Sequence, residues 1–241
     1  MLKLLFLFLL CSLSFSEPVH YGNEMETDMY HFNFETGDNF LKTSFKLRDH
    51  GDASVIFFDR LILEKDENIC LNSYSPYIIG SHSLAFTSIN ATMAKIETTD
   101  SIFSLIFYYT PSYIKFDLYI NSSDPLFYQG CNGSSISLIT RMKVKTQVED
   151  DIEDKEEERK DRRLSFGSSS FQWINTVTTN QGEANVNASY IYPSQKWNFQ
   201  VIEPSYVLWD PLISPLTNEA MHAKTFNYIS MFILFYLLIL F

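Results

Sequence analysis

Residues 113–120 read YIKFDLYI, and apolar and polar side chains alternate along this stretch. Because successive side chains of a β-strand point to opposite faces, the stretch predicts a strand with one buried and one solvent-facing side. The buried side would consist of Ile114, Phe116, Leu118 and Ile120, and the solvent side of Tyr113, Lys115, Asp117 and Tyr119.

The same alternation recurs at Ser135–Lys145, where Arg141, Lys143 and Lys145 would face solvent. Similar patterns, separated by clusters of Asn, Asp, Ser, Gly and Pro, predict further strands at Met29–Glu35, Phe40–Leu47, Ser54–Leu63, Leu84–Ile89, Met93–Thr98, Ile102–Tyr109, Phe171–Thr178, Ala184–Tyr192, Trp197–Ile202 and Tyr206–Trp209. Many short strands at this spacing are typical of all-β folds. We therefore predict an antiparallel β-sandwich with a long acidic loop and a C-terminal apolar tail.

The composition agrees with a β-sheet protein and argues against one that binds nucleic acid. The chain has 241 residues, a length that allows one domain or two small ones. Aromatic residues make up 16% of it, and its formal net charge is −11. Aromatic side chains favour sheets. An acidic chain lacks the basic surface that a phosphate backbone requires.

The first 16 residues, MLKLLFLFLLCSLSFS, have the pattern of a secretory signal peptide. Lys3 supplies the positive charge, Leu4–Leu10 the apolar core, and Ser14 and Ser16 a small-x-small cleavage site. The alternative is an uncleaved membrane anchor. Its apolar core would be far shorter than the ~20 residues that a spanning helix needs.

Residues 213–241 have the pattern of a GPI-attachment signal, in which a polar spacer precedes a short apolar tail. The tail, Tyr228–Phe241, is followed by no Lys or Arg. The preferred attachment site is Asn218, because the small Ala220 stands two positions later. Ser214 is a weaker choice, because the bulky Leu216 stands at the corresponding position. The alternative is a short membrane helix that the mature protein keeps.

Four N-x-S/T sequons predict N-glycosylation, provided that the chain enters the secretory pathway. The asparagines of these sequons are Asn90, Asn121, Asn132 and Asn187. Asn121 follows a strong strand pattern and Asn132 precedes a glycine, so both are expected near turns.

Removal of the signal peptide would leave Cys70 and Cys131 as the only cysteines. Two cysteines in an oxidising compartment predict one disulfide. The alternative is a pair of buried free thiols. One disulfide is too few for a disulfide-scaffold fold, so a hydrophobic core must provide most of the stability.

The segment 149–163 reads EDDIEDKEEERKDRR and contains nine acidic and five basic residues. We expect a solvated loop or linker here, because so few apolar side chains cannot offset the entropy of ordering the chain. Cleavage at the basic residues is an alternative.

The acidic segment separates a predicted sandwich body, residues 17–148, from a β-rich part, residues 164–212. We expect the later strands to complete the same sandwich, since so short a piece rarely folds alone; a membrane-proximal stalk is the alternative.

No stretch of the sequence matches an established catalytic or metal-binding motif. The nearest approach to a nucleophile elbow, Gly80–Leu84 (GSHSL), lacks the final glycine and reads as a turn. The five histidines form no metal-ligand spacing, and we expect no cofactor or metal. A glycosidase is an alternative, since its two catalytic carboxylates can lie far apart in the sequence.

Aromatic side chains crowd the last third of the chain. They are Phe171, Trp173, Tyr190, Tyr192, Trp197, Phe199, Tyr206 and Trp209. Trp and Tyr are enriched in binding faces, so a surface for protein or carbohydrate is one interpretation. The other interpretation, which we favour, is that these rings pair across strands and fill the core.

The order of a strand at Val55–Glu64, then Cys70, then a strand at Ile102–Tyr109 loosely resembles the strand–cysteine–strand rhythm of CUB-type extracellular sandwiches. The four cysteines and the acidic calcium-site pattern of that family are missing here. We assign no family from this resemblance.

These features together predict a glycoprotein held on the outer leaflet of the plasma membrane by a GPI anchor. Its expected role is non-enzymatic: adhesion, recognition or receptor support, with an extracellular protein or carbohydrate as partner. The alternatives are a short-tailed single-pass accessory subunit and an anchored extracellular hydrolase.

Overall fold

The computed structural model describes residues 19–21, 24–26, 30–37, 39–48, 52–145, 149–151, 162–191 and 193–215. Within these residues the chain forms twenty β-strands, one short 3-10 helix, η1 (Ile79–Ser81), and no α-helix. Every strand pairing is antiparallel, so the predicted all-β, antiparallel fold class is confirmed.

The first group of strands pairs in the order β1–β2–β3–β4–β5–β12–β18–β17. Three short strands extend it: β6 and β7 pair with β5, and β13 pairs with the end of β12. The bounds are β1 (Val19–Tyr21), β2 (Glu24–Glu26), β3 (Tyr30–Gly37), β4 (Phe40–Leu47), β5 (Ala53–Lys65), β6 (Asn68–Cys70), β7 (Tyr77–Ile78), β12 (Ser135–Lys145), β13 (Glu149–Asp151), β17 (Gly182–Ile191) and β18 (Ser194–Phe199).

The second group pairs in the order β8–β9–β10–β11. The end of β11 pairs with β19 and its start with β20; β19 pairs further with β16, and β20 with β15 and through it β14. The bounds are β8 (Leu84–Asn90), β9 (Met93–Thr98), β10 (Phe103–Tyr109), β11 (Ile114–Asn121), β14 (Arg163–Phe166), β15 (Ser169–Gln172), β16 (Thr176–Thr179), β19 (Tyr206–Trp209) and β20 (Leu212–Pro215). Because β17 pairs with both β16 and β18, it joins the two groups.

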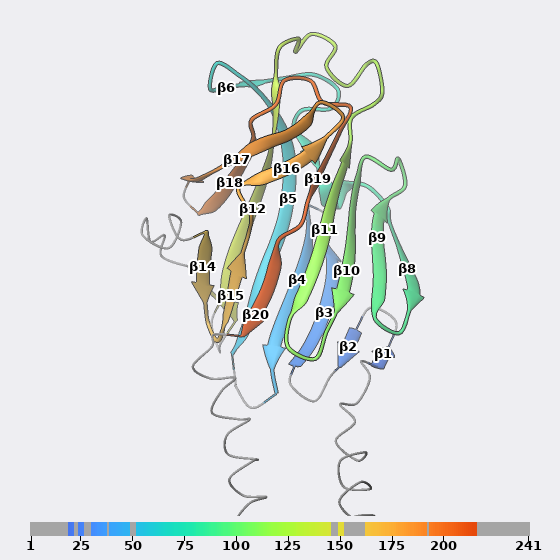
Figure 1. The fold of residues 1–241 in the computed structure, drawn as a ribbon, viewed down its shortest axis with the longest axis vertical. Coiled ribbons are helices and arrows are strands. Elements are labelled where there is room, and N and C mark those ends of the chain that lie inside the picture. Colours follow the sequence, from blue (N-terminus) through green and yellow to red (C-terminus); the bar gives the residue numbers. More distant parts are fainter. Residues whose placement is uncertain are drawn as a thin grey trace, which may run out of the picture.

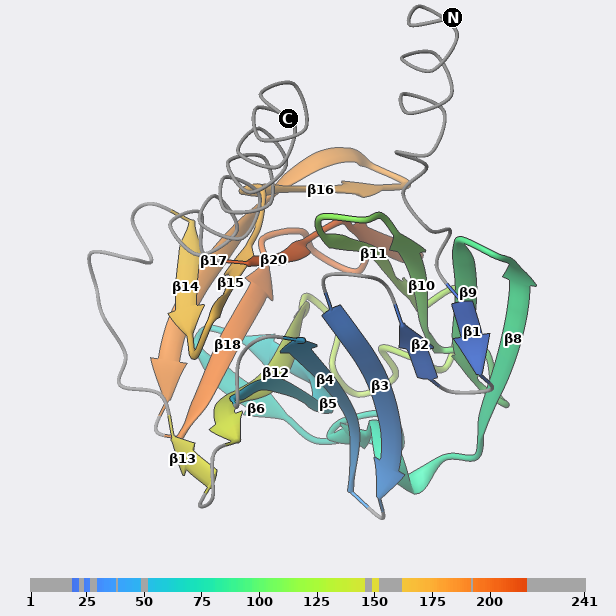
Figure 2. The same cartoon turned by 90° about the horizontal axis from the view of Figure 1, so that it is seen from below.

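Aromatic side chains fill the space between the two groups, which lie opposite each other in Figure 2. The ring of Phe58 on β5 lies 6.1 Å from that of Phe103 on β10 and 5.9 Å from that of Phe116 on β11. The alternation that predicted β11 is confirmed, because its four inward side chains are completely buried: Ile114, Phe116, Leu118 and Ile120. A period-2 pattern thus places one face of each strand in the core.

The predicted strand Phe171–Thr178 is wrong in one respect, since the chain forms two strands there. β15 pairs with β14 and β20, whereas β16 pairs with β17 and β19. The break lies at residues 173–175, where the Trp173 side chain is buried against Phe171 and Trp197. A change of pairing partners does not interrupt the alternation of apolar and polar residues. The sequence therefore predicted one strand where the chain forms two.

The acidic run begins with β13, whose Glu149–Asp151 backbone pairs with Lys143–Lys145, and its last residue, Arg163, starts β14. Residues 152–161 between them lie outside the described part, as do residues 1–16 and 216–241. The strands that follow the run pair with strands that precede it: β18 with β12, and β19 and β20 with β11. In the part of the chain that the structure describes, no helix has the length and apolar character needed to cross a bilayer.

The two ends of β11 define the two ends of the strand assembly. At the start of β11, Ile114 pairs with Ile213 of β20, which continues to Pro215. At the other end, Ser122 begins the loop that leads to β12. Eight residues of strand separate these points by roughly 26 Å. Figure 1 shows the two ends, with the end of β20 low in the view and the loop after β11 at the top; we call the latter the loop end.

Candidate functional site

A hollow of about 460 Å³ lies at the loop end, between residues 122–134 and residues 203–205. Carboxylate, amide, hydroxyl and apolar groups line it together. The lining includes Asp124, Leu126, Tyr128, Gln129, Asn132 and Glu203. Such a mixture of charged, polar and apolar groups suits a partner that presents both polar and apolar atoms.

The first wall of the hollow, residues 122–134, is tied to the segment after β5. The predicted disulfide between Cys70 and Cys131 is confirmed, with 5.8 Å between the Cα atoms. The Asn72 side-chain amide donates hydrogen bonds to the carbonyls of Phe127 and Gln129, at 2.9 and 3.1 Å. These ties hold the wall in one position.

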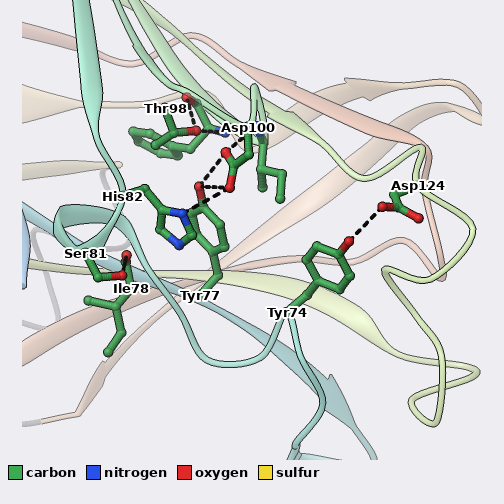
Figure 3. Close-up of polar contacts among 10 residues, drawn as sticks. Tyr74, Tyr77, Ile78, Ser81, His82, Thr98, Asp100 and Asp124 are labelled. Atoms are coloured by element: carbon green, nitrogen blue, oxygen red, sulfur yellow. Dashed lines mark hydrogen bonds and ion pairs between the residues drawn. The ribbon is translucent and has the colours of Figure 1, made fainter.

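Tyr74 adds a further tie by donating a hydrogen bond to Asp124 Oδ2, with an O–O distance of 2.7 Å (Figure 3). The pKa of Asp124 lies below its usual value because the Leu126 amide and the Tyr74 hydroxyl donate to the carboxylate. The site therefore presents a carboxylate that stays ionised at neutral pH.

The second wall, residues 203–205, is hydrogen-bonded to the first. The Pro204 carbonyl accepts from Ser122 Oγ at 2.5 Å and from Tyr128 OH at 2.8 Å. The Gly133 amide donates to the carboxylate of Glu203, and the Glu203 amide donates to the Ser134 carbonyl. The two walls thus form one connected structure.

Exposed apolar side chains surround this site. Ile69 and Leu71 flank Cys70 and are 55% and 73% exposed. Leu126, in the first wall, is 52% exposed, and Ile202, the residue before the second wall, is 55% exposed. Exposed apolar side chains gathered in one region mark a contact surface for another molecule.

A second polar cluster lies at the same end and contains Tyr77, His82 and Asp100 (Figure 3). Asp100 is two residues before Ile102, whose carbonyl accepts from the amide of Asn121 at the end of β11. His82 Nδ1 lies 3.1 Å from Asp100 Oδ2, and Tyr77 OH donates to Oδ1 at 2.8 Å. The Tyr77 and His82 rings are stacked with centroids 4.0 Å apart.

Burial and hydrogen bonding oppose each other at the Asp100 carboxyl. Burial alone would raise the pKa of Asp100, but donors from Thr98, Ile102 and Tyr77 and the neighbouring His82 hold it below its usual value. Burial raises the pKa of Tyr77, and its bond to Asp100 raises it further.

The orientation of His82 by Asp100 resembles the base–carboxylate pair of hydrolases. Among the described residues, however, no Ser, Thr or Cys hydroxyl or thiol is hydrogen-bonded to His82. Of the predicted turn Gly80–Leu84, the first two residues belong to η1 (Ile79–Ser81) and the last, Leu84, begins β8. In the same described part, no three His, Cys, Asp or Glu side chains gather as a metal site.

Asp100→Asn is expected to lower the free energy of unfolding by about 1 kcal/mol at pH 7, because hydrogen bonds to a charged carboxylate are lost. The folded-state pKa of Asp100 is depressed, so its stabilisation is present above the unfolded value of about 3.9 and disappears as pH falls through the folded value. Urea unfolding at pH 7 and below pH 4 should therefore show a difference that shrinks on acidification. A constant difference, or an equal loss in the exposed control Asp66→Asn, would contradict this.

The four sequon asparagines occupy different places in the fold. Asn90 ends β8 and is exposed, Asn132 is exposed in the first wall of the hollow, and Asn187 is exposed on β17. Asn121, the last residue of β11, is half-buried. Asn218, the predicted lipid attachment site, lies outside the described residues.

The late aromatic residues are mainly core residues, so the binding-face interpretation is wrong for all three tryptophans. Trp173, Trp197 and Trp209 are at most 5% exposed and contact one another or Phe171. Tyr190 and Tyr206 are half-buried, and Tyr192 lies outside the described residues. Core filling, the interpretation favoured from the sequence, is confirmed for the buried rings.

Asp124 and Glu203 have no recognisable motif around them, so the sequence did not single them out. They line one hollow because the pairing of β12 with β18 and of β11 with β19 brings two distant loops to one end. The one local signal is the turn composition of Asn121–Pro125 (NSSDP), which predicts a loop but not its partner. Comparison of the chain with protein-family models, with curated proteins and with solved structures gives no match.

Proposed function

We propose that this protein is a GPI-anchored cell-surface glycoprotein that recognises an extracellular protein or carbohydrate through its loop end. In this proposal the two opposed strand groups are the sheets of one β-sandwich body. The signal peptide is removed, the chain is glycosylated, and the lipid is attached at Asn218. The protein performs no chemistry of its own.

The observation that carries this proposal is the position of the hollow relative to β20. The hollow and the exposed side chains of Leu126 and Ile202 lie at the loop end, whereas β20 leads to Pro215 at the opposite end. An anchor attached a few residues after Pro215 would leave the loop end facing away from the membrane. A contact surface at that position is accessible to a partner on another cell or in the medium.

Two further observations support the details. Ser214 lies within β20, where its hydroxyl is hydrogen-bonded to Gln172 and Ser170, so cleavage there would cut a paired strand. This favours Asn218 as the attachment site. A recognition role is favoured over hydrolysis because, among the described side chains, no serine, threonine or cysteine is hydrogen-bonded to His82.

One experiment in two steps tests the proposal. Phosphatidylinositol-specific phospholipase C is expected to release the protein from the cells that express it, because a GPI anchor is the only attachment proposed. Retention on cells that release a known GPI-anchored control would contradict the anchor.

The released protein is then applied to cells of the same kind. The double variant Leu126→Asp/Ile202→Asp is expected to bind at least about tenfold more weakly, which corresponds to ~1.4 kcal/mol, because two carboxylates would be buried against the partner. Ile191→Asp is the matched control, since Ile191 is equally exposed (53%) but pairs with Ser194 at the start of β18, away from the loop end. Equal binding by the three proteins would contradict the proposed contact surface.

A further inference from the structure

Sheet edges with a strand partner on one side only include the whole length of β8 and a shorter stretch of β17. Among the described strands, β8 pairs with β9 alone along its whole length, Leu84–Asn90, and it is the outermost strand on its side in Figure 1. At Asn187–Ser189, β17 pairs with β18 alone. The other described strands with one partner, β1, β6, β7, β13 and β14, have at most four residues each. A long free edge is a template on which another chain can add a strand.

These two edges lack the usual protection against such pairing. Neither Leu84–Asn90 (LAFTSIN) nor Asn187–Ser189 (NAS) contains a charged residue or a proline. Ile89 within β8 is 48% exposed, and Ile191 at the end of β17 is 53% exposed. An edge without charged residues or proline lacks the features that normally prevent edge-to-edge association.

The same two edges carry sequons. Asn90 is the last residue of β8, and Asn187 lies on β17; both side chains are exposed. Asn90 Oδ1 accepts hydrogen bonds from the amide and hydroxyl of Thr92, at 2.9 and 3.1 Å. Its Nδ2 atom, to which a sugar would attach, donates to no described residue.

The remaining sequons are not on free edges. Asn121 ends β11, which is paired on both sides, with β10 and with β19. Asn132 lies in the loop between β11 and β12. The chain therefore offers a matched comparison between edge sequons and other sequons.

We propose that N-glycans at Asn90 and Asn187 cover the free edges of β8 and β17, and that without them a second copy of this chain pairs along β8. An N-glycan is bulky and strongly hydrated, so it blocks the approach of another strand as a charged side chain would. The second copy is the favoured occupant because two uncharged β8 edges pair antiparallel about a two-fold axis without charge repulsion. This inference rests on the glycosylation included in the proposed function.

The test compares variants of the mature protein purified from expressing cells, with the mass of each assembly measured by sedimentation. Asn90→Gln/Asn187→Gln removes both glycans and is expected to shift the protein from the monomer mass to twice that mass or more. Thr92→Ala/Ser189→Ala removes the same glycans with both asparagines in place and should do the same. Asn90→Lys/Asn187→Lys also removes the glycans but adds an edge charge, so it should stay monomeric. Asn132→Gln should stay monomeric too.

The outcomes separate this inference from the proposed function. Peptide mapping of the wild type that finds no glycan at Asn90 and Asn187 would overturn the inference and also the glycosylation on which it rests. Glycans at both sites combined with a monomeric Gln variant would overturn the inference alone. If the Lys variant associated as much as the Gln variant, the inference would also be overturned. A general loss of solubility without glycans would then explain the association of both variants. Circular dichroism of each variant verifies that the strands are retained.

Discussion

Trp197→Ala is expected to lower the free energy of unfolding by about 3–5 kcal/mol, the largest single-residue effect that we predict. Trp197 on β18 is completely buried, and its ring centroid lies 4.9 Å from that of Trp173 and 5.2 Å from that of Trp209. Its indole N–H also donates to Thr140 Oγ1 at 2.8 Å. The substitution would leave a cavity and a buried hydroxyl with one partner fewer.

Urea unfolding followed by circular dichroism would measure this loss. Ile191→Ala on the neighbouring β17 is the control, since Ile191 is 53% exposed and surface substitutions change stability by at most about 0.5 kcal/mol. A Trp197→Ala protein as stable as the control would mean that the packing of Trp197 against Trp173 and Trp209 does not stabilise the core. Because binding is proposed at the loop end, the variant should still bind cells when folded.

The strand pattern was predictable where the alternation is long and local. The bounds of β4, β9, β12 and β19 were predicted to the residue, and those of β10 and β11 to within one residue. In each of these strands the burial of one face determines which residues are apolar. The sequence carries this information because the same physical constraint acts at every second position.

The pairing partners of the strands were not predictable from the sequence. This accounts for the strands that were predicted wrongly or not at all. The change from β15 to β16 within Phe171–Thr178 and the existence of β20 both depend on strands far away in the chain. The short strands β6 and β7 have too few residues for a pattern to appear. The candidate site was hidden for the same reason, because Asp124 and Glu203 belong to loops that only the strand topology brings together.

The cysteine pair was the exception, since elimination identified its partners without any knowledge of the fold. Cys70→Ala/Cys131→Ala is expected to lower the free energy of unfolding by roughly 4 kcal/mol, because 61 residues of sequence separate the two cysteines and a link of that span removes much unfolded-state freedom. Replacement of both residues avoids an unpaired thiol at the buried Cys131. We also expect less protein at the cell surface, since partly unfolded chains are retained and degraded.

The position of the disulfide adds a second expected effect that stability alone would not produce. Cys131 lies in the first wall of the hollow, where Asn72 and Tyr74 supply the other ties to β6 and the segment after it. Loss of the covalent tie should therefore make residues 122–134 more susceptible to proteolysis under conditions in which the strands stay folded. Limited proteolysis with mass spectrometry, at a urea concentration well below the unfolding midpoint, would detect the cuts. Trp197→Ala, which is expected to lose similar stability, is the control. Equal cleavage of this loop in both variants would mean that the disulfide stabilises the whole fold and has no separate role in holding the site in place.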